Sequence, residues 1–296
     1  MLSMLGRPHE ADRGLCDPVM ERSPAGQVPL FDAYAPAEIA VRVRDIGVAK
    51  ANAPIPTVVA LAILAGAFIS LGALFYIVIM TPGHSATGWP FGLTRLAGGV
   101  SFSLGLVLVI IGGAELFTGN NLLAMAWAAK RVTTRQVFHN WVWVYLGNFI
   151  GSLGTTVLVL LAGIQTLGDG SVGDTMVAIA RAKVSLDPVS AMARGVLCNV
   201  LVCLAVWLCM AARAVADKIL AIVFPIAAFV ACGFEHSVAN MFFLPIGMAL
   251  TAYSGMPIGI SDALQNLLFV TLGNILGGTV LVALVYWFVY LRESRP

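Results

Sequence analysis

The sequence contains the stretches GAELFTGN (residues 113–120) and GFEHSVAN (residues 233–240), which share the pattern G-x-E-x-x-x-x-N. Each stretch lies near the middle of an apolar segment that is long enough to cross a bilayer. A carboxylate, a hydroxyl or imidazole, and an amide are costly at membrane depth, so they mark a protected path by default. Matched, interrupted segments in the two halves of a chain are typical of transport sites. The two stretches therefore predict a transport site to which both halves contribute.

The composition indicates a polytopic membrane protein. Of the 296 residues, 59% are hydrophobic and only 11% are charged, and the mean hydropathy is +0.91. A soluble domain carries about 25% charged residues. The net charge of +2 is accompanied by no basic patch, so we expect the lipid membrane and not a nucleic acid as a partner. The sequence has no zinc-type arrangement of Cys and His, and we expect neither a metal nor a cofactor.

Six apolar segments are long enough to be membrane spans, namely residues 57–80, 95–132, 138–164, 188–212, 216–252 and 262–291. The second and the fifth are too long for one straight helix, and each holds one copy of the pattern. We therefore expect each to be two half-helices, with breaks at 116–121 and 234–240. Thr118 and Asn240 are expected to cap the second half-helices with their side chains.

The charge distribution predicts that both termini are cytoplasmic. Thirteen Lys and Arg residues lie in the N-terminal segment, in two connections and at the C-terminus. The opposite side has four, which are Arg95, Arg181, Lys183 and Arg194. Cytoplasmic loops carry the excess of Lys and Arg, and six spans place both termini on one side. We expect residues 1–33 to be a disordered cytoplasmic tail, residues 34–52 an amphipathic helix with Ile39, Val43 and Ile46 on one face, and residues 53–292 the channel domain.

A second repeated motif supports an internal repeat. The tripeptide Leu-Gly-Asn occurs at residues 146–148 and again at residues 272–274. Because each repeat then holds three spans, the second repeat must be inverted relative to the first in the membrane. The fold class is therefore an all-α membrane protein with a 3+3 inverted repeat and two broken helices. We expect Asn148 and Asn274 to form hydrogen bonds between helices.

Four stretches resemble the formate/nitrite transporter family. They are GGVSFSLGLVLVIIGGAELFTGN (98–120), CNVLVCLAVWL (198–208), FPIAAFVACGFEHSVANMFFLPIGM (224–248) and TLGNILGGTVLVALVYWFVYLRE (271–293). The resemblance implies an aquaporin-like hourglass fold in a homopentamer of the cell membrane, with one pore in each protomer. It implies small monovalent anions as substrates, with formate as the main expectation and nitrite or hydrosulfide as alternatives. Formate channels commonly have Ser where this chain has Gly119, and ELFTG is closer to the nitrite branch.

The resemblance also implies roles for individual residues. His236 resembles the central pore histidine, Thr118 its partner in the first loop, and Asn199 an amide that faces the histidine. The resemblance further implies apolar constrictions at Phe102, Leu106 and Phe229, and vestibule lysines at Lys50 and Lys183. Glu115 and Glu235 are expected to be structural, accepting hydrogen bonds from loop N–H groups or pairing with the histidine.

The chemistry of these residues suits weak-acid anions. A bare anion in hydrocarbon costs many kcal/mol, so its charge must be compensated or removed. Half-helix N-termini offer inward N–H groups, and an imidazole can exchange a proton near neutral pH. A neutral-solute pore of the aquaporin type is a competing interpretation, but the paired Asn-Pro-Ala motifs of that class do not occur. A membrane enzyme is a third, and the sequence has no P-loop, G-x-S-x-G or His/Cys cluster to support it.

Overall fold

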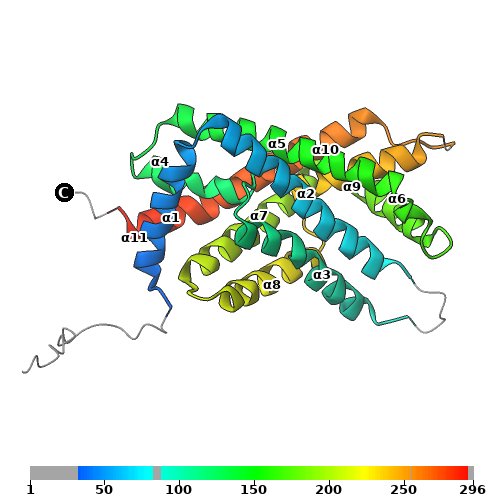
Figure 1. Cartoon of the computed structure of the whole chain (residues 1–296), viewed down its shortest axis with the longest axis horizontal. Coiled ribbons are helices and arrows are strands. Elements are labelled where there is room, and N and C mark those ends of the chain that lie inside the picture. The colour runs from blue at the N-terminus through cyan, green and yellow to red at the C-terminus, as the bar shows by residue number, and fades with distance from the viewer. Residues whose placement is uncertain (1–32, 83–87, 254, 293–296) are drawn as a thin grey trace, which may run out of the picture. The chain divides into compact units, whose positions relative to one another are not determined.

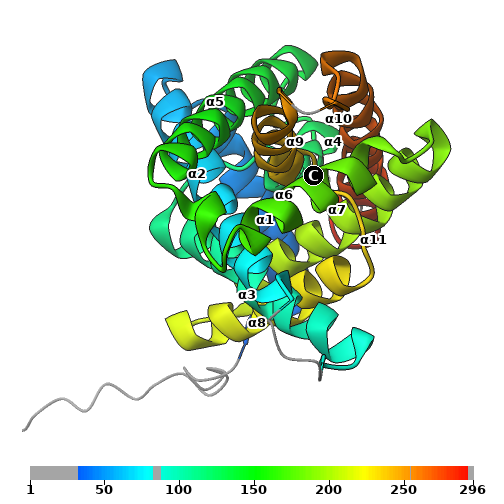
Figure 2. The ribbon, with the colours of Figure 1, turned by 90° about the vertical axis from the view of Figure 1, so that its right-hand side faces the viewer.

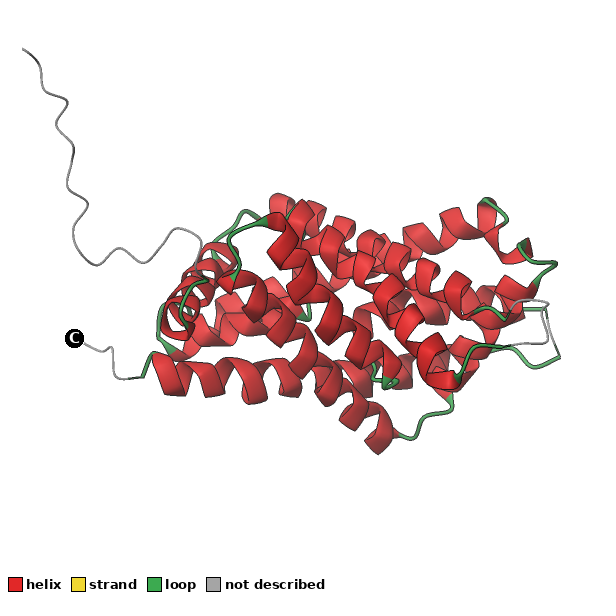
Figure 3. Ribbon diagram, turned by 90° about the horizontal axis from the view of Figure 1, so that it is seen from below, coloured by secondary structure: helices red, strands yellow, loops and turns green. Residues whose placement is uncertain are grey.

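The computed structural model describes residues 33–82, 88–253 and 255–292, and within these ranges the chain consists of helices and loops (Figure 3). The helices are α1 (Pro36–Ala51), α2 (Ile55–Met80), α3 (Phe91–Gly112), η1 (Gly119–Leu122), α4 (Leu123–Ala128), α5 (Thr134–Leu161), η2 (Ile164–Thr166), α6 (Ser171–Val184), α7 (Pro188–Ala211), α8 (Val215–Ala231), α9 (Ser237–Thr251), α10 (Ile260–Ile275), η3 (Leu276–Leu284) and α11 (Val285–Tyr290). Of these, η1 and η2 are 3₁₀-helices and η3 is a π-helix. The expected tail lies outside the described residues, except for Ala33.

Five helices in the described ranges are long and apolar enough to cross a membrane: α2, α3, α5, α7 and the continuous segment from α10 to α11. Their outer surfaces carry large apolar side chains such as Leu64, Leu71 and Phe75, each more than two-fifths exposed. Such surfaces are unusual on a soluble protein and are suited to lipid. The sixth expected span, 216–252, corresponds to α8 and α9, which are separate helices of 17 and 15 residues.

Three helix pairs form the centre of the structure, and two of them, α2–α5 and α7–α10, have the same kind of glycine contact. Helix α2 packs along α5 and α3 packs along α8, as Figures 1 and 2 both show, and α7 packs along α10. A G-x-x-x-G sequence faces the partner in α5, at Gly147 and Gly151, and another runs from α10 into η3, at Gly273 and Gly277. A methyl group built on Gly151 would overlap the carbonyl oxygen of Ile63 in α2, and one on Gly273 would overlap that of Met192 in α7. The glycines therefore let the helix backbones touch.

The shorter helices cover the two ends of this arrangement. Helix α1 packs on α4 at one end of the view in Figure 1, and α6 packs on α9 at the other. Ile39 and Val43 of α1 are buried in a cluster with Leu122 and Met125. Ile46 of the same helix is 38% exposed and lines a cavity.

Gly151→Ala tests the backbone contact between α2 and α5. The added methyl group must push against the carbonyl oxygen of Ile63, and we expect a loss of about 1–3 kcal/mol in stability. Gly154→Ala is the matched control, because it lies in the same helix and has nothing within 4 Å of the new methyl group. Thermal unfolding of the detergent-solubilised protein measures both variants. Equal midpoints for the two would contradict the close packing.

Candidate functional site

The loop between α3 and η1 and the loop between α8 and α9 meet at a buried contact between Thr118 and His236. Thr118 Oγ1 lies 3.0 Å from His236 Nε2, and both residues are buried. The other ring nitrogen, Nδ1, accepts the N–H of Ala239 at 3.1 Å. Nδ1 therefore carries no hydrogen in this arrangement, and the proton of a neutral ring is on Nε2, which donates to Thr118 Oγ1. The hydroxyl hydrogen of Thr118 is left available as a donor.

The glycines of the two G-x-E motifs end the preceding helices. Gly113 and Gly233 adopt left-handed backbone angles, with φ of 76° and 72°. The N–H after each glycine returns to a carbonyl oxygen inside the helix, that of Val109 in α3 at 2.9 Å and that of Phe229 in α8 at 3.0 Å. This is the usual way in which a glycine terminates a helix. The chain then turns, and the acidic residue two positions later begins the loop.

The predicted capping residues are wrong. The Thr118 side chain caps no helix, and the side-chain amide of Asn240 donates to Glu235 and to Asn266. The cap of α9 is His236, whose Nδ1 accepts the hydrogen bond from Ala239. The prediction was wrong because histidine is not among the preferred capping residues, whereas threonine and asparagine are.

Asn148 of α5 and Asn274 of α10 hold the two loops with equivalent sets of hydrogen bonds. Asn148 Oδ1 accepts the N–H of Phe117 at 2.9 Å, and its Nδ2 donates to the carbonyl oxygens of Ala62 at 2.8 Å and Glu115 at 2.9 Å. The expected hydrogen bonds from these asparagines to neighbouring helices are therefore confirmed, because Ala62 belongs to α2.

The second set repeats the first atom for atom. Asn274 Oδ1 accepts the N–H of Ser237 at 2.9 Å, and its Nδ2 donates to the carbonyl oxygens of Gly195 at 2.8 Å and Glu235 at 2.9 Å. Each asparagine thus satisfies two buried peptide groups beside a loop, the N–H of Phe117 or Ser237 and the carbonyl oxygen of Glu115 or Glu235, and ties them to a carbonyl oxygen inside α2 or α7.

In the first half, a lysine, a glutamate and two asparagines form one network. Lys50 Nζ of α1 lies 3.1 Å from Glu115 Oε2 and 2.8 Å from Asn120 Oδ1. The amide of Asn120 donates to Glu115 Oε2 at 2.6 Å and to Asn140 Oδ1 at 2.9 Å. The amide of Asn140 donates to the carbonyl oxygen of Lys50 at 3.3 Å, which closes the ring of contacts.

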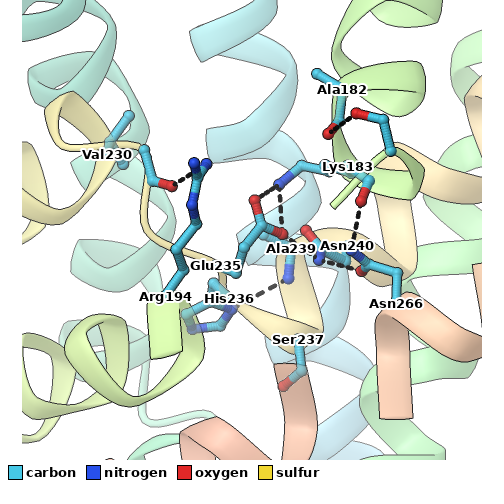
Figure 4. Close-up of polar contacts among 12 residues, drawn as sticks. Ala182, Lys183, Arg194, Val230, Glu235, His236, Ser237, Ala239, Asn240 and Asn266 are labelled. Atoms are coloured by element: carbon cyan, nitrogen blue, oxygen red, sulfur yellow. Dashed lines mark hydrogen bonds and ion pairs between the residues drawn. The ribbon is translucent and has the colours of Figure 1, made fainter. Parts of the chain in front are cut away.

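The second half contains a similar network of the same residue types (Figure 4). Lys183 Nζ of α6 lies 3.0 and 3.1 Å from the two oxygens of Glu235. The amide of Asn240 donates to Glu235 Oε2 and to Asn266 Oδ1, both at 2.7 Å, and Asn266 donates to the carbonyl oxygen of Lys183 at 2.8 Å. In the described residues, the glutamates therefore pair with lysines. The sequence analysis had expected them to bond to loop N–H groups or to His236.

Two cavities lie on opposite sides of the Thr118–His236 contact. The first, of about 210 Å³, is lined by Lys50, Glu115 and Leu106 among others. The second, of about 190 Å³, is lined by Lys183, Glu235, Phe102, Phe229 and His236 among others. The Phe102 and Phe229 rings meet edge to face with centroids 5.6 Å apart, and the Phe229 ring stacks on His236 at 6.0 Å. Phe102 and Phe229 thus lie together on one side, and Leu106 lies on the other.

The comparisons with known proteins show which family this chain belongs to. The family model described as "Formate/nitrite transporter" matches residues 37–288. The chain belongs to the formate/nitrite transporter family. It is 41% identical over 281 residues to the "Formate channel FocA" of Escherichia coli strain K12, covering 89% of this chain and 97% of that protein. It is 41% identical over 273 residues to the "Probable formate transporter" of Methanothermobacter thermautotrophicus, covering 88% and 98%.

Solved structures of this family have the same fold. The structure titled "Pentameric formate channel with formate bound" matches with a TM-score of 0.73 and 38% identity, over 80% of this chain and 98% of that one. One titled "FNT family ion channel" matches with a TM-score of 0.74 and 31% identity, over 86% and 98%. The chain is thus an all-helical membrane protein of a channel and transporter family, and not an enzyme.

Asn199 donates its side-chain amide to the first loop and to α10. Its Nδ2 donates to the carbonyl oxygens of Thr118 at 3.3 Å and Asn274 at 2.7 Å, and to Asn121 Oδ1 at 3.0 Å. It therefore ties the first loop to α10 and does not bond to His236. Its Oδ1 is buried without a protein partner in the described part of the chain.

Sequence reasoning missed Asn140 and Asn266, although a signal for them exists. Each asparagine stands eight residues before Asn148 or Asn274, in the shared pattern N-x-x-x-x-x-L-G-N. The shorter tripeptide had already indicated the repeat, and extending the alignment by two helical turns would have found both residues.

Asn274→Leu tests the loop-holding role. The variant keeps a side chain of similar size but leaves the N–H of Ser237 and the carbonyl oxygens of Gly195 and Glu235 without this partner. Each buried group left unpaired costs about 1–3 kcal/mol, so we expect a clearly lower midpoint of thermal unfolding in detergent. Asn52→Ala, at an exposed asparagine, is the control and should leave the midpoint nearly unchanged. Retention of the wild-type midpoint by Asn274→Leu would refute the role.

Proposed function

We propose that the chain is a cell-membrane channel for small weak-acid monovalent anions, with formate as the first candidate and nitrite or hydrosulfide as alternatives. The observation that carries this proposal is the buried contact between Thr118 and His236, with a cavity holding a Lys–Glu pair on each side. Relatives named as formate channels, and a family structure with formate bound, support formate.

The channel domain consists of six spans in a 3+3 inverted repeat. The spans are α2, α3 with α4, α5, α7, α8 with α9, and α10 through α11. Support comes from equivalent contacts in the two halves: Ala62 and Gly195 accept from Asn148 and Asn274. Three spans in each repeat require opposite orientations in the membrane. The hourglass shape, with half-helices meeting at mid-depth, follows from this arrangement.

Both termini lie in the cytoplasm, and five copies assemble into a homopentamer. The cytoplasmic assignment rests on the excess of Lys and Arg in the segments next to them. It places the cavity of Lys50 at the cytoplasmic face and the cavity of Lys183 at the opposite face. The pentamer is supported by the solved pentameric formate channel, with which this chain shares 38% identity.

The Lys–Glu pairs draw anions inward without trapping them. A lysine alone would hold an anion strongly, whereas conduction requires binding that is easily reversed. Glu115 and Glu235 accept hydrogen bonds from Lys50 and Lys183 and offset most of the charge. The ammonium groups still lower the cost of bringing an anion from water toward His236.

His236 removes the charge of the anion at the narrowest point. An anion beside the ring favours the imidazolium form, and a proton from the second cavity, which both His236 and Ala239 line, adds at Nδ1. Transfer of the Nε2 proton to the anion then gives a neutral acid and a neutral ring that carries its proton on Nδ1. Thr118 fits both states, because its hydroxyl can accept from Nε2–H or donate to bare Nε2. The neutral acid passes the apolar surfaces of Phe102, Phe229 and Leu106.

His236→Asn separates the proton-carrying role from the structural one. Asparagine is a good helix cap and can accept the N–H of Ala239, so we expect a normally assembled protein. It cannot titrate, and proton uptake coupled to formate should fall by at least about tenfold. Formate and proton entry are measured together in liposomes between about pH 5 and pH 8.

The exposed His139 provides the matched control. It lies in α5 and contacts Trp143, so His139→Asn removes a histidine without touching the site and should transport as the wild type does. If His236→Asn also takes up formate and protons as the wild type does, His236 is not the group that carries the proton.

Phe102→Ala and Phe229→Ala test the apolar constriction. Each variant removes one ring of the edge-to-face pair and opens space beside His236. We expect acetate flux relative to formate flux to rise roughly several-fold, because the larger acid now fits. Isotope uptake with the two acids gives this ratio directly. An unchanged ratio in both variants would assign the rings to packing only.

A further inference from the structure

Arg194 of α7 places a guanidinium at the second cavity that has most of its donors unused. It lines the cavity together with Lys183 and Glu235, and in Figure 4 Arg194 lies to the left of Glu235 whereas Lys183 lies to the right. Its hydrogen bond to the carbonyl oxygen of Gly233 is long, at 3.4 Å, and its residue is exposed. A guanidinium has five N–H donors in a planar fork, so most of them are free for a ligand.

The other cations of this cavity are already engaged. Arg95 donates to the carbonyl oxygens of Val230 and Ala231 and to the hydroxyl of Tyr76, so it closes the end of α8. Lys183 is paired with Glu235 through both carboxylate oxygens. Arg194 has no carboxylate at ion-pair distance within the described ranges. It is therefore the cation at this cavity with the most capacity to bind an incoming anion.

The repeat shows that Arg194 is an addition to one half only. The carbonyl oxygen of Arg194 accepts the N–H of Glu235 at 3.2 Å, and the carbonyl oxygen of Leu61 accepts the N–H of Glu115 at the same distance. Leu61 is thus the structural counterpart of Arg194 in the first half. Nothing in the backbone arrangement requires an arginine there, because leucine makes the same main-chain contact.

The first cavity differs accordingly. Its lining residues include the cations Lys50 and Lys218 but no arginine. An ammonium is a point charge, whereas a guanidinium matches the two oxygens of a carboxylate with parallel N–H groups. The two faces of the protein therefore differ in how well they can hold a carboxylate, although the Lys–Glu–Asn networks beneath them are built from the same residue types.

We propose that Arg194 forms a docking site for small carboxylates in the vestibule opposite the cytoplasm, which the cytoplasmic vestibule lacks. This rests on the proposed channel function. A carboxylate held by the Arg194 fork waits in front of the Phe102–Phe229 pair, and half-saturation is reached at a lower concentration from this face. A passive pathway cannot drive net flux between equal concentrations. The ratio of maximal rate to half-saturation concentration must therefore be the same from both faces. A half-saturation concentration that is lower at the Arg194 face is accompanied by a maximal rate that is lower by the same factor.

The test uses the full-length protein in right-side-out and everted membrane vesicles, with initial rates of isotopic formate uptake over a concentration series at equal pH on both sides. In the wild type we expect a lower half-saturation concentration from the Arg194 face than from the Lys50 face. Arg194→Leu installs the residue of the other half and should raise the value at the Arg194 face by roughly threefold to tenfold. The two faces should then become similar.

Two further variants separate docking from charge. Arg194→Lys keeps the charge but loses the fork, and we expect it to behave more like the leucine variant than like the wild type. Arg181→Gln removes an arginine of α6 that does not line the cavity, and it should change neither half-saturation concentration. Gel filtration of each variant verifies assembly.

The outcomes are distinct. Wild-type uptake with equal values from both faces, or no change in Arg194→Leu, overturns the docking site while the proposed channel function stands. Wild-type values in Arg194→Lys, or a shift in Arg181→Gln equal to that in Arg194→Leu, overturn it in favour of diffuse charge. Absence of formate uptake by the wild type overturns the channel function for formate and the docking site with it.

Discussion

Peptide groups that are removed from water must find partners within the protein, and the buried loops after α3 and α8 break this rule unless side chains supply those partners. Asn148 and Asn274 provide these partners. Each amide bonds two carbonyl oxygens and one N–H around a loop. The asparagines lie in α5 and α10, whose glycines bring them against α2 and α7. The rest of the site depends on this support, because it fixes where each loop can place a side chain.

With the loops held, a single side chain performs two tasks. His236 caps α9 through Nδ1 and contacts Thr118 through Nε2. The cap fixes the ring and favours a neutral tautomer, since a hydrogen on Nδ1 would displace the bond from Ala239. In the proposed mechanism, an imidazolium formed beside an anion therefore gives a proton readily to that anion. In the same proposal, the lysine and glutamate pairs at the two cavities lower the cost of an anion's approach without binding it tightly.

The sequence predicted much of this arrangement, and its errors have physical causes. The G-x-E glycines and the Leu-Gly-Asn echo correctly indicated equivalent elements, because glycines at helix ends and contacts leave a readable pattern. The cap by His236 was missed because capping preference describes average helices. The pairing of Glu115 with Lys50 was missed because α1 returns to the loop only in three dimensions. The bond from Asn199 to the carbonyl oxygen of Thr118 was missed for the same reason, because α7 meets the loop only in three dimensions.

The most direct measurement is the simultaneous recording of anion and proton entry into liposomes that contain the wild-type protein, for formate and for chloride. A histidine that neutralises its anion predicts one proton entering with each formate. It also predicts no detectable chloride flux, because chloride has no stable neutral acid at neutral pH. Formate entry as a current without protons, or chloride entry at a comparable rate, would contradict neutralisation at His236.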